Sequence, residues 1–406
     1  MKALGRRGLT QVGGVCFLWV VLVGGAVWNR LACEGRTDDQ KTKGPAAKPP
    51  AAAPPAAAPP AAAPPAAAPP AAAPPAAAPP AAAPPAAAPP AAKAPAAQPA
   101  PPPPQLPRGV RMERDVAYVT NGDEAQRLDL YLPETPPTRP LPLVVHIHGG
   151  GWMGGSKYPC PVVAMVSRGY AVASVEYRFS QKAVFPAQIQ DCQAAIRWLR
   201  AQSQRYQLDP DHVGVIGGSA GGHLSALVGT AGGKRVFPPI GGNEEQADRV
   251  QCVCDIFGPT NFATVVQQAA ADPNVRNIFQ FNMRGDPYSS LIGTRLDADK
   301  AKTDAVSPVH YVSEDSPPTL ILHGTHDALV PYAQSVEFAA ALKAKGVPVW
   351  LQTIPGAGHG GPGFTKPAIL VLTQAFFDRY LKGVELPIEL VPEAEVAVDP
   401  PAPARK

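Results

Sequence analysis

The feature that most constrains this sequence is a short apolar run that ends in a cluster of glycines around one serine. Residues 213–216 lead into Gly217-Gly-Ser-Ala-Gly-Gly222, and His223-Leu-Ser-Ala-Leu-Val228 follows. This order predicts a buried strand, a very tight turn at Ser219 and then a helix. Only small neighbours allow such a turn to close, and the turn points the serine hydroxyl away from the backbone.

The pattern Gly217-x-Ser219-x-Gly221 is typical of a nucleophilic serine, but two other interpretations fit the same residues. The stretch is either a glycine-rich turn with an incidental serine or a phosphate-binding loop. A Walker-type loop requires Lys and then Ser or Thr after its last glycine, whereas His223 and Leu224 follow here. The pattern by itself therefore does not distinguish a nucleophilic Ser219 from an incidental one. Residues elsewhere in the chain must distinguish the two interpretations.

Proline and alanine determine how much of the chain can fold. The 406 residues include 53 prolines, and much of the 45% hydrophobic content is alanine in a Pro-Pro-Ala-Ala-Ala repeat. Since proline has no amide donor and alanine buries little surface, we expect residues 34–107 to form a disordered stalk. Residues 108–387 suffice for one large α/β domain. The proline-rich, acidic residues 388–406 are expected to form a disordered tail.

The N-terminus has the pattern of an export segment. Lys2, Arg6 and Arg7 precede residues 12–28, which carry no charge. This pattern predicts an export signal or membrane anchor at residues 1–33, and the apolar stretch is long enough for a short span. A buried core helix is the alternative. We therefore expect an exported protein, either secreted or held in the cell envelope, and the sequence leaves cleavage, lipidation or retention of the segment open.

Charge and cysteine content exclude several partners. The net charge is only +4 and no basic run interleaves with aromatic residues, so we expect no nucleic-acid partner. The six cysteines lack zinc-ligand spacing, which predicts no metal site. Cys160 and Cys192 are a candidate disulfide if the domain is exported, and buried free thiols are the alternative. The sequence does not determine the oligomeric state.

Strand and helix patterns alternate through the folding region. Besides the glycine-rich stretch, the predicted strands are residues 125–132, 143–147, 170–175, 250–257, 318–323 and 349–354, and the predicted helices are 162–166, 186–206, 333–345 and 366–381. Repeated β-α units predict a mostly parallel sheet with helices on both faces. Residues 261–304 show no clean periodicity, so we interpret them as a small cap insertion over a site.

Candidate partners for Ser219 follow two of these strands. A serine hydroxyl needs a base to act as a nucleophile, and the base needs a carboxylate to hold its tautomer. Asp327 follows the predicted strand 318–323, and His359 follows the strand 349–354. Both lie past the carboxyl ends of strands, where open α/β sheets place their sites. Asp255, at the end of another strand, is the alternative acid.

Acyl transfer also needs amide donors that stabilise an oxyanion. Ala220 follows the candidate nucleophile, and Gly150 and Gly151 lie in a glycine-rich loop after the strand 143–147. These three amides are the candidate oxyanion hole. Trp152 is interpreted as either a pocket wall or a core residue. His223 is interpreted as either a pocket residue or a helix-packing residue.

The order of these motifs resembles that of serine esterases of the α/β-hydrolase fold. The motifs that carry the resemblance are His148-Gly-Gly-Gly-Trp152, Glu176-Tyr-Arg178, Phe185-Pro-Ala, the glycine-rich turn, residues 254–260, His323-Gly-x-x-Asp327 and Gly358-His-Gly. The glycine loop is similar to that of hormone-sensitive-lipase-like enzymes. Gly218 stands where that group typically has aspartate, which places the chain closer to bacterial feruloyl and acetyl-xylan esterases.

The resemblance implies roles for individual residues. It implies Ser219, Asp327 and His359 as the catalytic triad and no cofactor or metal. The expected function is that of an exported carboxylic-ester hydrolase acting on a small-molecule or polysaccharide-linked ester, with contact to a membrane only through the N-terminal segment. The alternatives are a peptidase or amidase of the same fold and an inert surface-displayed binding protein. The acyl and alcohol specificity stays open.

Overall fold

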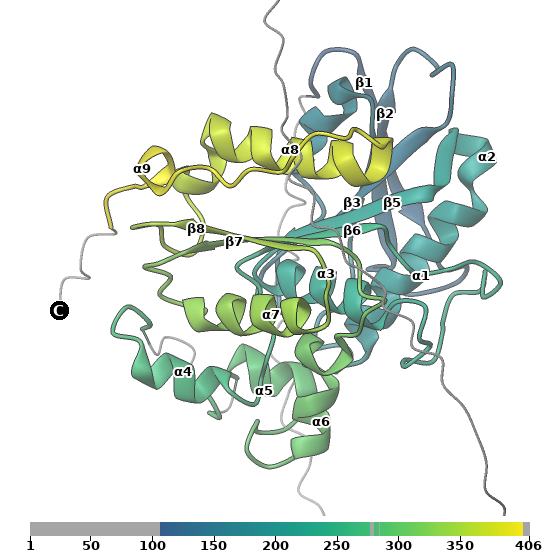
Figure 1. The fold of residues 1–406 in the computed structure, drawn as a ribbon. Coiled ribbons are helices and arrows are strands. Elements are labelled where there is room, and N and C mark those ends of the chain that lie inside the picture. Colours follow the sequence, from purple (N-terminus) through teal and green to yellow (C-terminus); the bar gives the residue numbers. More distant parts are fainter. Residues whose placement is uncertain (1–105, 277–279, 284, 401–406) are drawn as a thin grey trace, which may run out of the picture. The chain divides into compact units, whose positions relative to one another are not determined.

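The computed structural model describes residues 106–276, 280–283 and 285–400. Eight strands form one sheet in the order β1-β2-β4-β3-β5-β6-β7-β8. Their bounds are β1 Val110–Ala117, β2 Arg127–Pro133, β3 Leu141–Ile147, β4 Ala171–Val175, β5 Leu208–Gly218, β6 Cys252–Ile256, β7 Thr319–Gly324 and β8 Val349–Ile354. Strand β2 pairs antiparallel with β1 and β4, and the other pairs are parallel. The predicted mostly parallel sheet is confirmed (Figure 1).

The predicted helices are present with small differences at their ends, and the structure adds short helices that the sequence did not predict. Their bounds are α1 Ala187–Ala201, α2 Ser203–Tyr206, α3 Ala220–Ala231, α4 Val265–Ala271, α5 Pro287–Ile292, α6 Lys300–Ala305, α7 Tyr332–Ala344, α8 Pro367–Lys382 and α9 Glu393–Val396. Three short 3-10 helices are η1 Val163–Arg168, η2 Pro308–Tyr311 and η3 Pro362–Thr365. The predicted helix 162–166 is thus a 3-10 helix, and the predicted helix 186–206 is two helices.

The sheet buries both of its faces, as a parallel sheet must. Successive strand residues point to opposite faces, so Leu143 packs in the cluster that contains α1 and α3, while Val144 packs in the cluster that contains α8. Phe338 of α7 packs with Ile321 of β7 on the face that carries α3. Figure 1 shows α8 on one side of the sheet and α1, α3 and α7 on the other.

The order of the central strands places the site. Strand β3 lies between β4 and β5, so the chain runs from β3 through η1 to β4 on one side of β3 and then through α1 to β5 on the other side. Loops at such a switch point leave a crevice at the carboxyl ends of the strands. The loop after β3 and the turn after β5 therefore meet at the same edge of the sheet.

The segment between β6 and β7 has the expected character of an insertion. Residues 261–304 contain the short helices α4, α5 and α6, drawn in green below α7 in Figure 1. Tyr288 of α5 is buried against Trp152 and Phe262, with ring centroids 5.4 and 5.0 Å away. The insertion is therefore anchored on the domain by aromatic contacts.

The prediction of a disordered C-terminal tail is wrong for residues 388–400. The amide of Val391 donates to Gln352 Oε1 at 2.7 Å, and the amide of Val398 donates to Pro355 O at 2.9 Å. Val396 is completely buried in the cluster on the α8 face. The few apolar residues of segment 388–400 are enough to order it, because they pack beside β8. Composition alone does not reveal that packing site.

The proposed disulfide is also wrong. Cys160 and Cys192 are both buried free thiols, and they belong to different hydrophobic clusters. Cys192 packs with α1 and Cys160 packs beside η1. The alternative interpretation as buried thiols is therefore correct for this pair.

The predicted export segment, residues 1–33, and the predicted stalk, residues 34–107, lie almost entirely outside the described residues. Among the residues that are described, no helix has the length and apolar character needed to cross a membrane.

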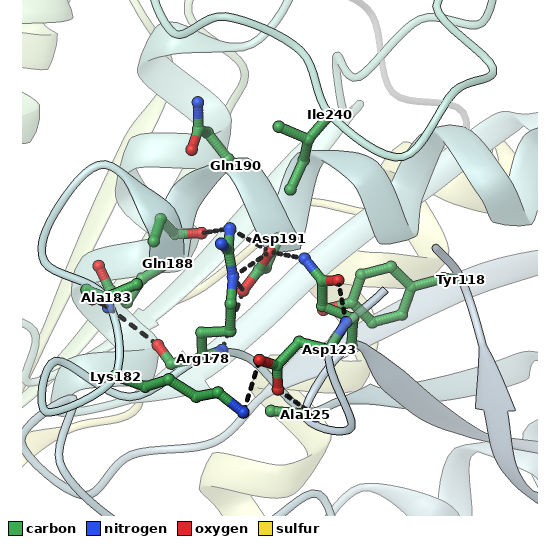
Figure 2. A network of polar contacts seen from close by, with 12 residues as sticks. Tyr118, Asp123, Ala125, Arg178, Lys182, Ala183, Gln188, Gln190, Asp191 and Ile240 are labelled. Atoms are coloured by element: carbon green, nitrogen blue, oxygen red, sulfur yellow. Dashed lines mark hydrogen bonds and ion pairs between the residues drawn. The ribbon is translucent and has the colours of Figure 1, made fainter. Parts of the chain in front are cut away.

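An ion pair braces the turn after β4. Arg178 donates through Nε and an Nη atom to both carboxylate oxygens of Asp191 at 2.8–3.1 Å. Gln126 donates to the same carboxylate at 2.7 Å, and Gln188 donates to Arg178 O at 2.8 Å. Figure 2 shows Arg178 of the turn after β4 beside Asp191 and Gln188 of α1. The network fixes residues 176–178, which support the site described next.

Candidate active site

Ser219 occupies a strained turn between β5 and α3. Its φ of 58° and ψ of −123° lie in a region that residues with a side chain rarely adopt. The Ser219 amide donates to Ile256 O at 2.9 Å, and the His223 amide donates to Ser219 O at 3.0 Å. These two hydrogen bonds hold the strained conformation, so the predicted tight turn is confirmed in geometry.

The glycines around Ser219 are required by close backbone contacts. A Cβ on Gly217 would collide with Gly221 O, and a Cβ on Gly221 would collide with Ile147 O. Gly218 has a different neighbour, because a Cβ there would lie 3.2 Å from the ring of Phe257. An aspartate at position 218 would therefore require that ring to move.

The glycine loop after β3 packs against this turn. A Cβ on Gly149 would lie 2.7 Å from Gly218 O and 3.3 Å from Ser219 Cβ. Gly150 and Gly151 have φ values of 116° and 60°, which turn their amides along a path that other residues avoid. Within the described residues, neither of these two amides donates to a backbone or side-chain acceptor. Both remain free to donate to a substrate.

Ala220 supplies a third amide of this kind. It is the first residue of α3, and the first amides of a helix have no acceptor within the helix. The sequence therefore predicted three donors that the fold gathers beside Ser219. The positive end of the helix dipole favours negative charge at the same place.

His148 braces the glycine loop through both of its ring nitrogens. Its Nδ1 lies 2.7 Å from Gly149 O and its Nε2 lies 2.8 Å from Glu176 Oε1. The imidazole also stacks on Tyr177, whose hydroxyl donates to His148 O at 3.0 Å. The ion pair of Arg178 with Asp191 thus supports the loop through Glu176 and Tyr177.

Asp327 and His359 form the predicted carboxylate–imidazole pair. His359 Nδ1 lies 2.7 Å from Asp327 Oδ2. Asp327 Oδ1 accepts from the amides of Leu329 and Val330 at 2.8 and 3.0 Å. Burial opposes ionisation of Asp327, but hydrogen bonds from His323 and His359 outweigh it and hold the pKa of Asp327 well below its ordinary value. Asp327 therefore stays negative and fixes the proton of His359 on Nδ1.

Asp255 does not take part in this pair. It is completely buried at the end of β6, and its Oδ1 accepts from the Gly258 amide at 2.9 Å. Burial raises the pKa of Asp255 to about 7. No contact between Asp255 and His359 therefore supports the alternative assignment of Asp255 as the acid partner.

Ser219 and His359 line one cavity with a volume of about 860 Å³. Gly150 and Gly151 line it as well, so all four residues face the same space. Pro287 is the contribution of the cap insertion, and the nearest atom to a Cβ on Gly151 would be Pro287 Cβ at 3.3 Å. The cavity therefore brings together the predicted nucleophile, the predicted base and two of the three predicted amide donors.

Two residues considered for the pocket do not line it. Trp152 is buried behind the glycine loop, where its Nε1 donates to His223 Nδ1 at 3.1 Å. His223 in turn donates from Nε2 to Val306 O at 2.8 Å, and burial lowers the pKa of His223 to about 4. Both residues support the glycine loop and α3 from behind, so the packing interpretation of each is correct.

Sequence reasoning missed Phe257. It follows β6 with φ of 45°, and its ring lies 4.5 Å from the His359 ring and 4.8 Å from the Phe364 ring. It also covers Gly218 and lines the cavity. Its place just past the carboxyl end of a strand is the signal that would have found it.

A strained serine on a strand-to-helix turn, a carboxylate–imidazole pair and free amides at the carboxyl edge of this sheet define an α/β-hydrolase. Residues 128–342 match the BD-FAE family, which is more than half of the chain, so the chain belongs to that family. The predicted resemblance to serine esterases of this fold is confirmed.

Relatives and solved structures agree with this class. The chain is 31% identical over 245 residues to the probable carboxylic ester hydrolase LipM of Mycobacterium tuberculosis, covering 58% of this chain and 54% of LipM. It is 31% identical over 252 residues to esterase LipQ of the same organism, covering 60% and 56%. A truncated carbohydrate esterase from gut microbiota superposes with a TM-score of 0.59 at 28% identity, covering 67% of this chain and 96% of that one. The chain spans about half the length of LipM and LipQ.

Within the described residues, no cluster of histidine, cysteine or carboxylate side chains has the arrangement of a metal site.

Proposed function

We propose that this protein is a carboxylic-ester hydrolase that acts through an acyl-enzyme on Ser219. The observation that carries the proposal is the contact between His359 Nδ1 and Asp327 Oδ2 at 2.7 Å, with His359 lining the same cavity as Ser219, Gly150 and Gly151. Esterase relatives support the same reaction class.

The proposed reaction has two halves. Ser219 Oγ attacks the ester carbonyl carbon while its proton passes to His359 Nε2, because Nδ1 is engaged by Asp327. The amides of Gly150, Gly151 and Ala220 stabilise the oxyanion, the C–O bond to the alcohol breaks, and His359 protonates the leaving alcohol. Water then attacks the acyl-enzyme by the same route, which releases the acid and restores Ser219.

Substitution of the triad tests this proposal. Ser219→Ala should lower hydrolysis of p-nitrophenyl acetate by at least about 10³-fold, and Asp327→Asn should lower kcat by roughly 10⁴-fold. Asp255→Asn is the matched control at another strand end, and its kcat should stay within a few-fold of the parent value. Normal turnover by Ser219→Ala, or an exchange of the two aspartate results, would contradict the assignment.

Amide substrates and an active-site probe separate the alternatives. A folded protein that cleaves a peptide amide faster than the matched ester would support the amidase alternative. A folded protein that does not react with a fluorophosphonate would support the inert alternative.

We further propose that residues 1–33 export the protein to the cell envelope or beyond it. The basic residues before the uncharged stretch 12–28 support this proposal.

A further inference from the structure

The cavity at Ser219 extends well past the groups that react. From Ser219 and His359 it continues over the α8 face of the sheet to Leu370 and Thr373 of α8. Ile216 of β5 and Leu322 of β7 line it on the way, and both belong to the hydrophobic cluster on that face. The cavity is therefore a groove between the sheet and the first turns of α8.

The lining of this groove is uncharged. Within the described residues, no Asp, Glu, Lys or Arg lines it, and its outer part is formed by Pro159, Pro161, Val162 and Leu370. His146 also lines it, with Nδ1 2.9 Å from Ser174 Oγ, and burial lowers the pKa of His146 to about 3. The groove thus offers an incoming group apolar contacts and no ionic partner.

The size and the open end of the groove point to a long occupant. A volume of about 860 Å³ is in the range of pockets that hold molecules of drug size, whereas an acetyl group needs only a small part of it. Leu370 is 55% exposed on α8 although it lines the groove, and Pro161 is exposed as well. Apolar side chains at an exposed lip are stabilised when an apolar ligand covers them.

We propose that this groove binds an uncharged apolar chain of more than two carbons attached to the scissile ester, as its acyl or its alkoxy group. The inference rests on the proposed ester hydrolysis and adds the chemical class of the substrate. Leu370 at the outer end acts as a specificity-determining residue, because it meets only chains that are long enough to reach α8.

Two series of esters test the chain length and its position. In the first series the full-length protein hydrolyses p-nitrophenyl esters from acetate to octanoate, and in the second it hydrolyses acetates of ethanol to octanol. In one of the two series kcat/KM should rise with chain length, by up to about fourfold for each methylene that reaches apolar surface. The series that rises identifies the acyl or the alkoxy group as the occupant.

A pair of neighbouring substitutions on α8 gives the sharper test. Leu370→Asp places a charge at the lip of the groove and should lower the ratio of kcat/KM for the eight-carbon ester to that for the two-carbon ester at least tenfold. Val371→Asp is the matched control, because Val371 is 66% exposed on the same turn and does not line the groove. Its ratio should equal that of the parent protein.

The outcomes distinguish this inference from the function on which it rests. The groove assignment would be overturned if short esters were hydrolysed and kcat/KM did not change with chain length in either series. It would also be overturned if Leu370→Asp and Val371→Asp had the same ratio of kcat/KM values. Both results would leave the proposed ester hydrolysis standing. Faster hydrolysis of acetylated oligosaccharides than of every aliphatic ester would overturn the groove assignment too. Absence of all ester hydrolysis in the folded parent would refute the proposed function itself.

Discussion

At the scale of single residues, two carboxyl groups at neighbouring strand ends have opposite properties. Asp255 lies near the end of β6 and Asp327 follows β7, and both are almost completely buried. Asp327 accepts two amides and two histidine contacts, which hold its pKa well below the ordinary value, whereas Asp255 accepts one amide and burial raises its pKa to about 7. The hydrogen-bond partners therefore decide which carboxyl group can orient an imidazole.

The raised pKa of Asp255 predicts that the protein loses stability as the pH rises from about 4 to about 7. Burial favours the neutral acid in the folded protein. The contribution of Asp255 to the free energy of unfolding is therefore complete below about pH 4 and is lost as the pH rises through 7. Asp255→Asn stays neutral and should gain up to about 3 kcal/mol relative to the parent protein between pH 5 and pH 8. Urea unfolding at both pH values measures this difference.

Asp297→Asn is the control for this measurement. Asp297 is exposed and Arg295 lowers its pKa, so it is ionised in both states over this range and the difference should stay flat. A flat difference for Asp255→Asn as well would contradict the raised pKa.

At the scale of elements, the C-terminal segment 388–400 holds the loop that carries His359. That loop begins directly after β8, and Pro355 O in it accepts the Val398 amide at 2.9 Å. Lys366, just after η3, donates to Ala397 O at 2.7 Å. A Cβ on Gly356 would collide with Val398 O, which shows how closely the two segments approach. The segment is therefore a brace for the base of the proposed triad.

Loosening this brace should impair turnover more than binding. Val396→Asp places a charge in a completely buried position and should release the segment. We expect kcat to fall roughly tenfold with KM within about twofold, because Ile216, Leu322 and Leu370, which line the groove, lie outside the braced loop. Steady-state kinetics with a p-nitrophenyl ester measure both constants.

Glu389→Gln is the matched control, since Glu389 is exposed on the same segment. It should leave both constants unchanged. An unchanged kcat in Val396→Asp, with the segment shown by limited proteolysis to be released, would mean that the brace has no role in positioning His359.

At the scale of the whole molecule, the sheet, the four hydrophobic clusters and the candidate site all lie within residues 106–400. Residues 1–105 contribute the apolar stretch and the Pro/Ala repeat. We propose that residues 106–400 carry catalysis and that the N-terminal residues determine where the protein is delivered.

A substitution in the apolar stretch tests this division. Val20→Asp combined with Val21→Asp interrupts residues 12–28 and should retain the protein in the cytosol of a bacterial host, with esterase activity preserved in the lysate. Cell fractionation and immunoblotting locate the protein. Ala62→Asp in the repeat is the control and should be exported like the parent protein. Equal localisation of all three proteins would contradict the export proposal.

The predictable parts of the fold are those determined by residues close together in the sequence. The β-α alternation, the tight turn at Ser219 and the glycine loop at Gly150 and Gly151 follow from hydrophobic period and from steric limits on the backbone. The order Ser219, Asp327, His359 at strand ends was readable because parallel strands bring their carboxyl ends to one edge.

Tertiary contacts decided the rest. Strand β1, the burial of Val396, the free thiol of Cys160 and the wedge of Phe257 between Gly218 and His359 depend on neighbours that are distant in the sequence. The composition of residues 388–400 predicted disorder because it shows how few apolar side chains they have. It does not show the surfaces against which those side chains pack. The sequence by itself determined the chemistry and its order along the chain, and packing determined which surfaces those residues share.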